Sequence, residues 1–224
     1  MSSYLKWATS LVSGGGPDIC ATIVDSSANG GADGSFRPSQ RRLFGGWTLL
    51  DGVSKDDNKT SVSIFKFSSS PSDTSSLHAA RNAVRRMKTL RHPDCLKYLD
   101  SCEVEEKKGG GGEVTLYVVT EKMTTLEDTL RELQQDENRN QYIAMGLKQI
   151  TRAVSFLNND AKIVHGIICM ESIGVTDSLD WKLHAFDVLS EFDDSPSEVP
   201  VLVRLFYLQI YIHYMPFQFL DMYM

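Results

Sequence analysis

Apolar and polar residues follow two different periods along the first half of the chain, and each period predicts a different element. Residues 61–67 alternate with period two, which predicts a strand, and the turn at 56–59 joins it to a strand at 47–50 as a hairpin. A Ser-rich loop at 68–76 precedes a predicted helix. Its apolar residues recur every three or four positions (Leu77, Ala80, Val84, Met87, Leu90). His92-Pro93 ends this helix, because proline disfavours helix in the residue before it.

The second half of the chain begins with strands and continues with helices. Residues 96–102 and 114–120 predict two strands around a Gly-rich hairpin tip at 109–112. A helix start follows at Thr124-Thr125, with acidic residues in its first turn. A long helix then carries one apolar stripe (Ile143, Leu147, Ile150, Val154, Leu157). Short apolar runs at 163–164, 173–175 and 181–186 complete an α+β order.

The two ends of the chain differ from the middle. Residues 1–16 predict a surface helix or a loose arm, 19–24 a strand, and the Ser/Gly-rich stretch 25–46 a loop or insert. Residues 201–224 carry only two charges and many aromatic residues. Their uncharged run, 205–220, is shorter than the ~20 residues that a membrane span needs. We therefore interpret this stretch as a foreign tail on a truncated chain and expect no transmembrane span.

Composition narrows the class of protein. The 224 residues are enough for one or two domains, and the net charge of −6 favours no direct binding of nucleic acid. The four cysteines lie apart, without the paired spacing of a zinc site, and fit a reducing compartment better than a disulfide framework. The chain opens without a signal-peptide core. We expect a cytoplasmic protein, with Golgi association as a second possibility.

Residues 163–191 have the spacing of the catalytic segment of a protein kinase, in which H-R-D and a later Asn precede D-F-G. Other phrases in order are V-S-I-F-K at 62–66, L-R-H-P-D at 90–94 and L-Y-V-V-T-E at 116–121. Four further phrases resemble one branch of the kinases more specifically: W-T-L-L-D-G, M-K-T-L-R-H-P, S-F-L-N-N-D and W-K-L. Together these phrases resemble the Scy-one-like family of catalytically inactive kinases.

The resemblance implies a protein-kinase-like α+β fold. It divides the chain into an N-terminal leader and insert at 1–46, an N-lobe of a sheet plus helix C at 47–123, and a partial helical C-lobe at 124–200. The hydrophobic tail, 201–224, follows. A helical-repeat region would come next in that family, so we expect this chain to be a fragment of the pseudokinase domain.

The positions that handle phosphate in an active kinase are occupied by other residue types here. His165 stands at the His of H-R-D, but Ile167 replaces the catalytic Asp and Ser172 the metal-binding Asn. The D-F-G triplet becomes Ala185-Phe186-Asp187. Phe65 falls on the nucleotide lysine, and Ala83 falls on its partner Glu in helix C. The resemblance therefore predicts no catalytic residue and no confident cofactor-binding or metal-binding residue.

Two residues are weak candidates for holding ATP and Mg²⁺. Lys66 lies one position beyond the lysine place, and strand alternation turns it away unless a β-bulge turns it back. Asp187 is a single carboxylate without its Asn partner, and we interpret it as a solvent-exposed turn residue. The glycine loop keeps only Gly45, Ser63 is a tolerable cover for adenine, and Gly174 stands where an apolar floor would be.

Strand alternation also predicts the direction of each side chain. Ser63, Phe65 and Phe67 share the face that looks into the cleft, and Lys66 shares the other face. His165, Phe186, Met87 and Tyr98 keep the hydrophobic column of the fold. The basic face of the first helix (Arg81, Arg85, Arg86, Lys88) is a solvated face or a docking patch.

Three functions remain open from the sequence. The first is a scaffold or adaptor; by resemblance it acts in vesicle traffic with coatomer or in tRNA export. The second is an atypical, weak kinase that binds ATP through Lys66 and Asp187. The third is a truncated gene product without function. Nucleotide binding separates the first two, and a transcript that covers the Pro200 junction tests the third.

Overall fold

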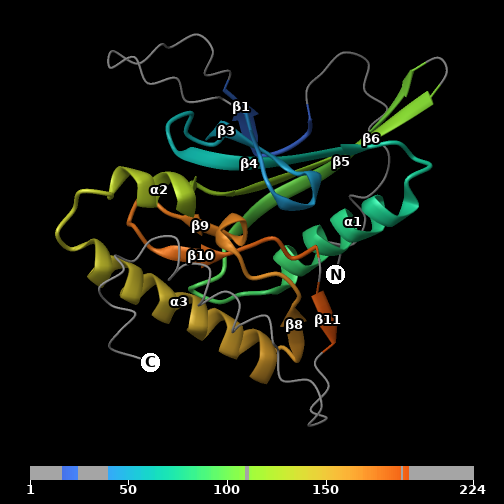
Figure 1. Cartoon of the computed structure of the whole chain (residues 1–224). Coiled ribbons are helices and arrows are strands. Elements are labelled where there is room, and N and C mark those ends of the chain that lie inside the picture. Colours follow the sequence, from blue (N-terminus) through green and yellow to red (C-terminus); the bar gives the residue numbers. More distant parts are fainter. Residues whose placement is uncertain (1–16, 25–39, 109–110, 188, 192–224) are drawn as a thin grey trace.

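The computed structural model describes residues 17–24, 40–108, 111–187 and 189–191. In Figure 1 an antiparallel sheet forms one layer, and the helices of the second half form another. The sheet has the order β1-β3-β4-β6-β5, with β2 also paired to β3. Its strands are β1 (Ala21–Ile23), β2 (Gln40–Arg42), β3 (Thr48–Ser54), β4 (Ser61–Ser69), β5 (Tyr98–Lys108) and β6 (Gly111–Glu121).

The predicted hairpins are present, with two differences at their edges. The β3–β4 hairpin turns at Asn58, whose φ is 53°, and the β5–β6 pairing runs to Lys108 and Gly111. The strand predicted at 96–102 begins only at Tyr98 and is interrupted by a register shift between Tyr98 and Asp100. The reading of 25–46 as a loop was wrong for residues 40–42, because these pair with Thr48–Leu50 as β2.

Helix α1 (Thr74–Thr89) lies against the inner face of the sheet, as its apolar spacing predicted. The Asp73 side chain accepts a hydrogen bond from the backbone N–H of Ser76 and so satisfies one of the free donors at the start of the helix. Leu77, Ala80, Ala83, Val84 and Met87 are buried. The helix ends at Thr89, three residues before His92-Pro93.

The second half of the chain holds two helices and short strands. They are β7 (Thr124–Thr125), α2 (Leu126–Glu132), α3 (Arg139–Asn159), β8 (Ile163–His165), the 3-10 turn η3 (Met170–Ser172), β9 (Ile173–Val175), β10 (Trp181–Leu183) and β11 (Leu189–Glu191). Thr125 caps α2 as predicted, because its hydroxyl accepts the N–H of Asp128. The stripe on α3 is buried except at Val154, which is partly exposed because Ala153 faces the core instead.

Strand β4 divides the interior into two hydrophobic clusters. Phe65 and Phe67 join the large cluster, which continues through α1 into the second half of the chain. Val62 and Ile64 join a small cluster with β1 and Val119 on the outer face. This split follows from the period-two alternation of a strand.

The turn after α1 ties the sheet layer to the second half. Asp94 is 2% exposed and accepts two hydrogen bonds of 2.8 Å from the Arg152 guanidinium on α3. The backbone of Asp94 accepts the N–H of Leu183, and Leu96 donates to the carbonyl of the same Leu183. The ring of His92 stacks on Phe156 at 4.7 Å. These contacts hold the two layers in one arrangement around the space between them.

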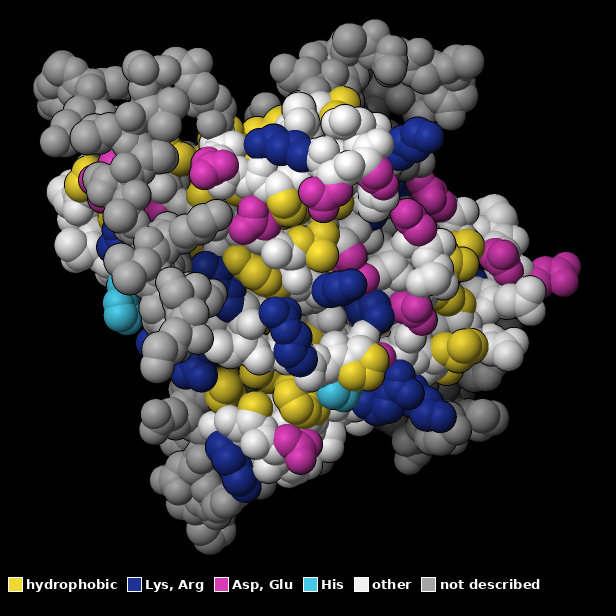
Figure 2. Space-filling model, turned by 180° about the vertical axis from the view of Figure 1, so that it is seen from behind, with side chains coloured by type: hydrophobic (Ala, Val, Ile, Leu, Met, Phe, Trp, Pro, Cys, Tyr) yellow, Lys and Arg dark blue, Asp and Glu magenta, His cyan; other side chains and the backbone are white. Residues whose placement is uncertain are grey.

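The α+β order and the layers are confirmed. On the surface seen from behind, hydrophobic, basic and acidic side chains are interspersed (Figure 2). Such a mixture is typical of a surface in contact with water. Within the described residues, no helix has the length and apolar character needed to cross a membrane. The predicted leader at 1–16, the hairpin tip at 109–110 and the tail at 201–224 lie outside the described residues.

Candidate functional site

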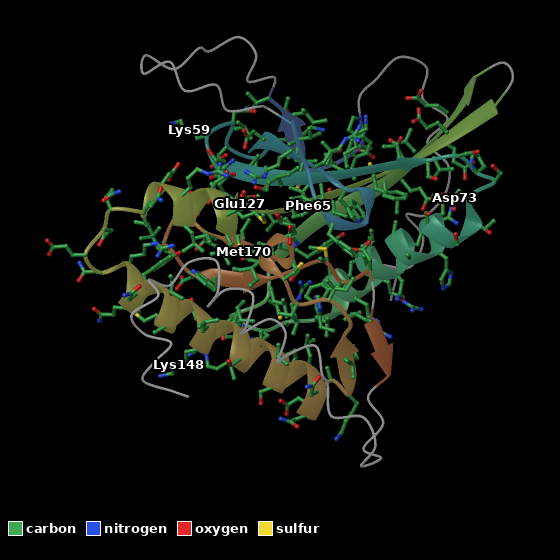
Figure 3. The ribbon with its side chains drawn as sticks, in the orientation of Figure 1. Lys59, Phe65, Asp73, Glu127, Lys148 and Met170 are labelled. Carbon is green, nitrogen blue, oxygen red and sulfur yellow. The ribbon has the colours of Figure 1, made fainter. Side chains whose placement is uncertain are left out.

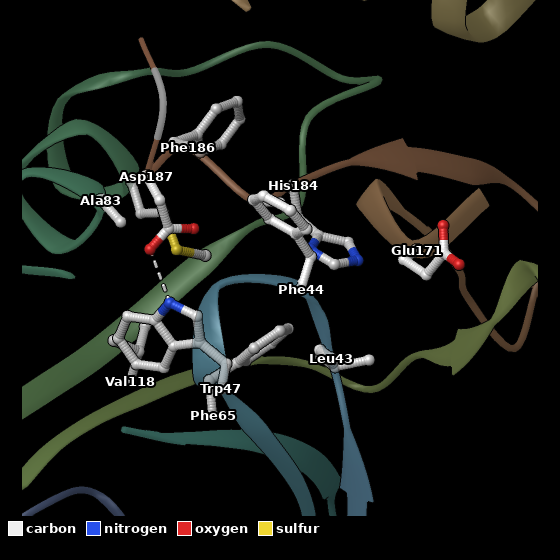
Figure 4. Close-up of a pocket in the computed structure, with 12 residues that line it drawn as sticks. Leu43, Phe44, Trp47, Phe65, Ala83, Val118, Glu171, His184, Phe186 and Asp187 are labelled. Carbon is white, nitrogen blue, oxygen red and sulfur yellow. Dashed lines mark hydrogen bonds between the residues drawn. The ribbon is translucent and has the colours of Figure 1, made fainter. Parts of the chain in front are cut away.

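The candidate site is the space between the sheet and the second half of the chain (Figure 4). It is walled by Trp47, Phe65, Ala83, Met87, Val118, Phe186 and Asp187, among others. The remaining cavity is about 20 Å³, which is room for about one water molecule. The lining is mainly apolar, so side chains fill the place where the kinase resemblance expects a nucleotide.

Phe65 points into this space and Lys66 does not. Phe65 is 5% exposed and contacts Trp47 and His184, with ring centroids 6.5 and 5.5 Å apart. It lies beneath β4 in Figure 3, on the side of the second half of the chain. Lys66 belongs to the opposite face, where its Nζ lies 6.0 Å from the ring of Tyr117. The predicted orientation is confirmed, and β4 pairs with β3 and β6 without a bulge at these residues.

Asp187 is held inside the cleft by a residue far away in the sequence. The indole Nε1 of Trp47 donates a hydrogen bond of 2.7 Å to Asp187 Oδ1. Its Oδ2 has no hydrogen-bond partner among the described residues. Asp187 lies in a turn, as interpreted, but the interpretation of its side chain as solvent-exposed was wrong. The backbone enters this turn through Ala185, whose φ is 65°, and the carboxyl group of Asp187 lies against Trp47.

Burial raises the pKa of Asp187 from its usual value near 3.8 to about 6, and the hydrogen bond from Trp47 opposes this rise only in part. The site thus holds a carboxyl group that is ionised at neutral pH and protonated in mild acid. One such group without a second ligand is a poor magnesium site. In the described ranges no three His, Cys, Asp or Glu side chains are grouped to hold a metal.

The remnant of the glycine loop folds onto the same carboxylate. The turn η2 (Phe44–Gly46) carries Gly45 at a φ of 72°, a conformation that favours glycine. A Cβ at Gly45 would lie 3.3 Å from Asp187 Cγ. Leu43, Phe44 and Trp47 line the cavity around this turn. The segment that resembles a phosphate cradle therefore packs as part of the wall.

Met123 occupies the space between the two positions that would flank adenine. The Ser63 hydroxyl accepts the N–H of Met123 at 3.0 Å and lies 3.2 Å from its carbonyl oxygen. A Cβ at Gly174 would lie only 2.5 Å from Met123 Sδ, so the thioether fills the place of the missing floor side chain. Met123 is 1% exposed. The sequence reasoning singled out Ser63 and Gly174 but missed the residue that joins them.

The hydrophobic column is preserved around His165. Its ring packs edge-on against Phe186 at 5.6 Å, and its Nε2–H donates to the carbonyl of His184 at 2.8 Å. Burial lowers the pKa of His165 to about 4 and that of His184 to about 3, so both rings are neutral at pH 7. Met87 lines the cavity beside Phe186, and Tyr98 packs against the same cluster. The predicted contact between His165 and Phe186 is confirmed.

The loop after β8 carries its remaining polar groups in internal hydrogen bonds. Ser172 is fully buried, and its hydroxyl accepts the N–H of Cys169 at 3.0 Å and donates to the carbonyl of Cys169 at 2.9 Å. Ile167, at the place of the catalytic Asp, is partly buried and offers no acid or base. This loop has no acid or base at the place of the catalytic Asp, and its one carboxylate, Glu171, lines the cavity from η3 instead.

A second link across the cleft comes from β2 and was not foreseen. The Arg41 guanidinium donates to Glu127 Oε2 at 2.7 Å and to Asp128, both in the first turn of α2. Arg131 pairs with the same two carboxylates from within α2. Arg41 lies more than 80 positions from both of these acidic residues in the chain. We call the pair of contacts made by Arg41 the β2–α2 clasp.

A sequence profile described as "Protein tyrosine and serine/threonine kinase" matches residues 44–200. The chain belongs to the protein kinase family. The "Probable inactive serine/threonine-protein kinase scy1" of Dictyostelium discoideum is 38% identical over 66% of this chain and 16% of its own length. The "Protein kinase-like protein SCY1" of Saccharomyces cerevisiae is 24% identical over 69% of this chain and 22% of its own. These relatives support the Scy-one-like branch of the kinase family.

A third relative is the mouse "Protein-associating with the carboxyl-terminal domain of ezrin". It is 26% identical over 76% of this chain and 20% of its own length. The chain thus spans about a fifth of the length of these curated relatives. The kinase-like fold, an N-lobe sheet with α1 in the place of helix C and part of a helical C-lobe, agrees with the matched family.

Within this kinase-like frame the structure brings some predicted positions together and separates others. Phe65, Ala83, Ala185 and Asp187 line one cavity. Lys66 is on the far side of β4 from it, so Lys66 and Asp187 cannot act on one phosphate group in this arrangement. The packing residues of the kinase fold remain, whereas apolar or internally bonded side chains stand at the positions of the catalytic ones.

Proposed function

We propose that this chain is a catalytically inactive protein-kinase-like domain that acts as a scaffold or adaptor. The observation that carries the proposal is Phe65, which fills the cleft at the place where the kinase resemblance puts the nucleotide lysine. The cavity left beside it holds about one water molecule. A domain of this kind acts through the surface that its fold presents, and partners are proteins rather than substrates of phosphotransfer.

No cofactor is part of this proposal. The Ser63 hydroxyl bonds the backbone of Met123, and Met123 fills the space above Gly174, so adenine would have to displace a buried side chain. Ile167 provides no base for the substrate hydroxyl, and the loss of such a group removes much of the positioning and charge stabilisation that catalysis needs.

The cellular role is proposed at two levels. The name of the mouse relative describes association with a protein domain, which supports protein partners for this chain as well. By the Scy-one-like resemblance the pathways are vesicle traffic with coatomer, at the Golgi or in the cytoplasm, or tRNA export. Binding of the purified chain to coatomer, compared with binding to tRNA-export factors, separates these two pathways.

The test of inactivity is a thermal-shift titration with ATP and Mg²⁺, together with radiolabel transfer from ATP to a general protein substrate. We expect no shift in melting temperature and no incorporation above background. An active kinase at the same concentration serves as the positive control. Incorporation that disappears in a Lys66→Ala variant would refute the proposal and favour a weak, atypical kinase.

The weak-kinase alternative requires Lys66 to reach the cleft. Its place on the outer face argues against this, because period-two alternation would have to be broken by a bulge at β4. The other alternative, a truncated gene product without function, concerns residues outside the described part. A transcript that covers the Pro200 junction with the same reading frame tests it.

A further inference from the structure

Lys66 is one member of a cross-strand row on the outer face of the sheet. The register pairs Arg42 of β2 with Thr48 of β3, Thr48 with Lys66 of β4, and Lys66 with Tyr117 of β6. Residues of one row project from the same face, and neighbouring strands lie about 4.8 Å apart. The backbones of Arg42 and Lys66 are therefore about 10 Å apart, with Thr48 between them.

This row borders a hollow that is distinct from the cleft. Its volume is about 550 Å³, against about 20 Å³ for the cavity in the cleft. Arg42, Thr48, Lys66 and Ser68 contribute polar surface to it, and Ile23, Val24 and Leu50 contribute apolar surface. A hollow of this size lies in the range that accommodates small ligands or a few peptide side chains.

In the described part of the chain, the two cations of the hollow have no ion-pair partner. Among the described residues, no carboxylate lies within ion-pair distance of Arg42 or Lys66, whereas Arg41 in the same strand pairs with two. Glu113 also lines the hollow, but it lies four residues along β6 from Tyr117, a separation of about 13 Å. Two cations and a threonine hydroxyl therefore face one space, and the one acid among its described lining residues, Glu113, lies further along the sheet.

We propose that this hollow binds the phosphate of a phosphorylated serine or threonine in a peptide segment of a protein partner. The guanidinium fork of Arg42 can donate two parallel hydrogen bonds to phosphate oxygens, Lys66 adds a point charge, and Thr48 adds a hydroxyl donor. The apolar end beside Ile23 and Val24 suits an aliphatic residue next to the phosphorylated one. Since a phosphate alone is much smaller than the hollow, the ligand has a body around its phosphate.

A peptide fits this surface better than a membrane does. The chain carries a net charge of −6, which repels an anionic bilayer as a whole, whereas a peptide experiences only the local pair of cations. The proposal goes beyond the inactive-kinase function and does not depend on it, because none of its residues lines the cleft. Nucleotide binding in the cleft would leave it standing.

The test measures fluorescence anisotropy of the full chain with two labelled peptide libraries. Both libraries have the same degenerate flanks, and their central residue is phosphoserine in one and serine in the other. We expect saturable binding to the phosphoserine library alone, with competition by inorganic phosphate. Arg42→Gln and Lys66→Met should each weaken it by about tenfold or more, since hydrogen bonds to charged groups have that magnitude. Lys66→Met keeps the aliphatic stem, and unchanged melting temperatures show that both variants fold.

Lys59→Met is the matched control, because Lys59 is an exposed lysine in the β3–β4 turn of the same sheet and does not line the hollow. Equal binding of both libraries, or equal loss of binding in Lys59→Met, overturns the proposal. Binding of inorganic phosphate that no variant changes means an adventitious ion only. Vesicles with phosphoinositide that bind through Arg42 and Lys66, while the phosphoserine library does not, make the occupant a lipid and also overturn the proposal.

Discussion

The indole of Trp47 hydrogen-bonds the carboxylate of Asp187 across 140 residues of sequence, at a distance of 2.7 Å. One partner belongs to the hairpin that would hold phosphate in an active kinase, and the other to the triplet that would hold magnesium. In this protein the two residues hydrogen-bond each other, where the corresponding segments of an active kinase would bind a ligand. The contact joins the two halves of the domain, so it bears on stability as well as on function.

Asp187→Asn should stabilise the protein at neutral pH. The pKa of Asp187 is raised to about 6 in the folded protein, so folding favours the protonated form. Its contribution to stability is present below pH ~4 and is lost as the pH rises through ~6. At pH 7 the Asn variant, which can still accept from Trp47, should therefore have a free energy of unfolding higher by about 1–3 kcal/mol.

The measurement is urea unfolding of both proteins between pH 4 and pH 8. The difference between them isolates Asp187, because His165 and His184, with pKa values lowered by burial, titrate in both. The difference should grow from pH 4 to pH 6 and then level off. A constant difference would mean that the carboxyl group is solvated, and the description of the cleft as closed would be wrong.

Gly174 and Met123 should be coupled energetically. Gly174→Leu restores the apolar floor of the kinase fold, but its side chain meets Met123 Sδ, so we expect a loss of about 1–3 kcal/mol. Met123→Ala leaves a cavity and should cost about 2–5 kcal/mol. The double variant should lose less than the sum, because the leucine fills the space that the methionine leaves. Chemical denaturation of the four proteins measures this cycle, and additive losses contradict it.

The strands and the faces they turn to the core could be predicted from the alternation of nearby residues. The contacts that close the cleft could not. Alternation along 61–67 was enough to turn Phe65 inward and Lys66 outward, since side-chain direction in a strand has period two. The burial of Asp187 depends on Trp47, which no local pattern links to it. Met123 was missed for the same reason. The one available signal was Gly174, whose lack of a side chain leaves space for another.

Arg41 shows how composition misled the interpretation of 25–46. A stretch rich in Ser and Gly indicates a loop, but the last residues before Leu43 pair with β3, where strand contacts override local propensity. The pairing then directs Arg41 to α2. An ion pair between positions so distant in the sequence can be predicted only once the fold is known.

The β2–α2 clasp should hold the edge of the sheet near α2 more than it adds to global stability. Arg41→Ala removes partly exposed ion pairs, so the free energy of unfolding should fall by about 1 kcal/mol or less. Amide hydrogen exchange in β2 and η2 should nevertheless become faster, because their link to α2 is lost. Arg131→Ala is the matched control, since Arg131 pairs with the same carboxylates within one helix. Equal exchange in both variants contradicts the clasp.

The strongest test of the filled cleft reintroduces the charges of an active kinase. Phe65→Lys puts an ammonium among Trp47, Val118 and His184 and loses the packing of the ring. The ammonium finds no carboxylate on α1, and Asp187, which lines the same cavity, is already hydrogen-bonded to Trp47. A loss of about 3–5 kcal/mol is expected. Phe65→Leu, which remains apolar, should cost about 1–2 kcal/mol. This pair of variants separates the cost of charge from the cost of a smaller side chain.

Ala83→Glu supplies the missing partner on α1. Alone, it also buries an unpaired charge, because Ala83 is 3% exposed. Combined with Phe65→Lys it should form the ion pair, and the double variant should be more stable than the sum of the single losses by about 1–3 kcal/mol. Urea unfolding of the four proteins measures this coupling. A coupling near zero would mean that position 65 does not face α1 across the cleft. A Phe65→Lys variant as stable as Phe65→Leu would mean that the ammonium is reached by water or by the carboxylate of Asp187. Since both lysine and glutamate would then be in the places of an active kinase while Ile167 stays, the double variant should still transfer no phosphate, even if it gains affinity for ATP.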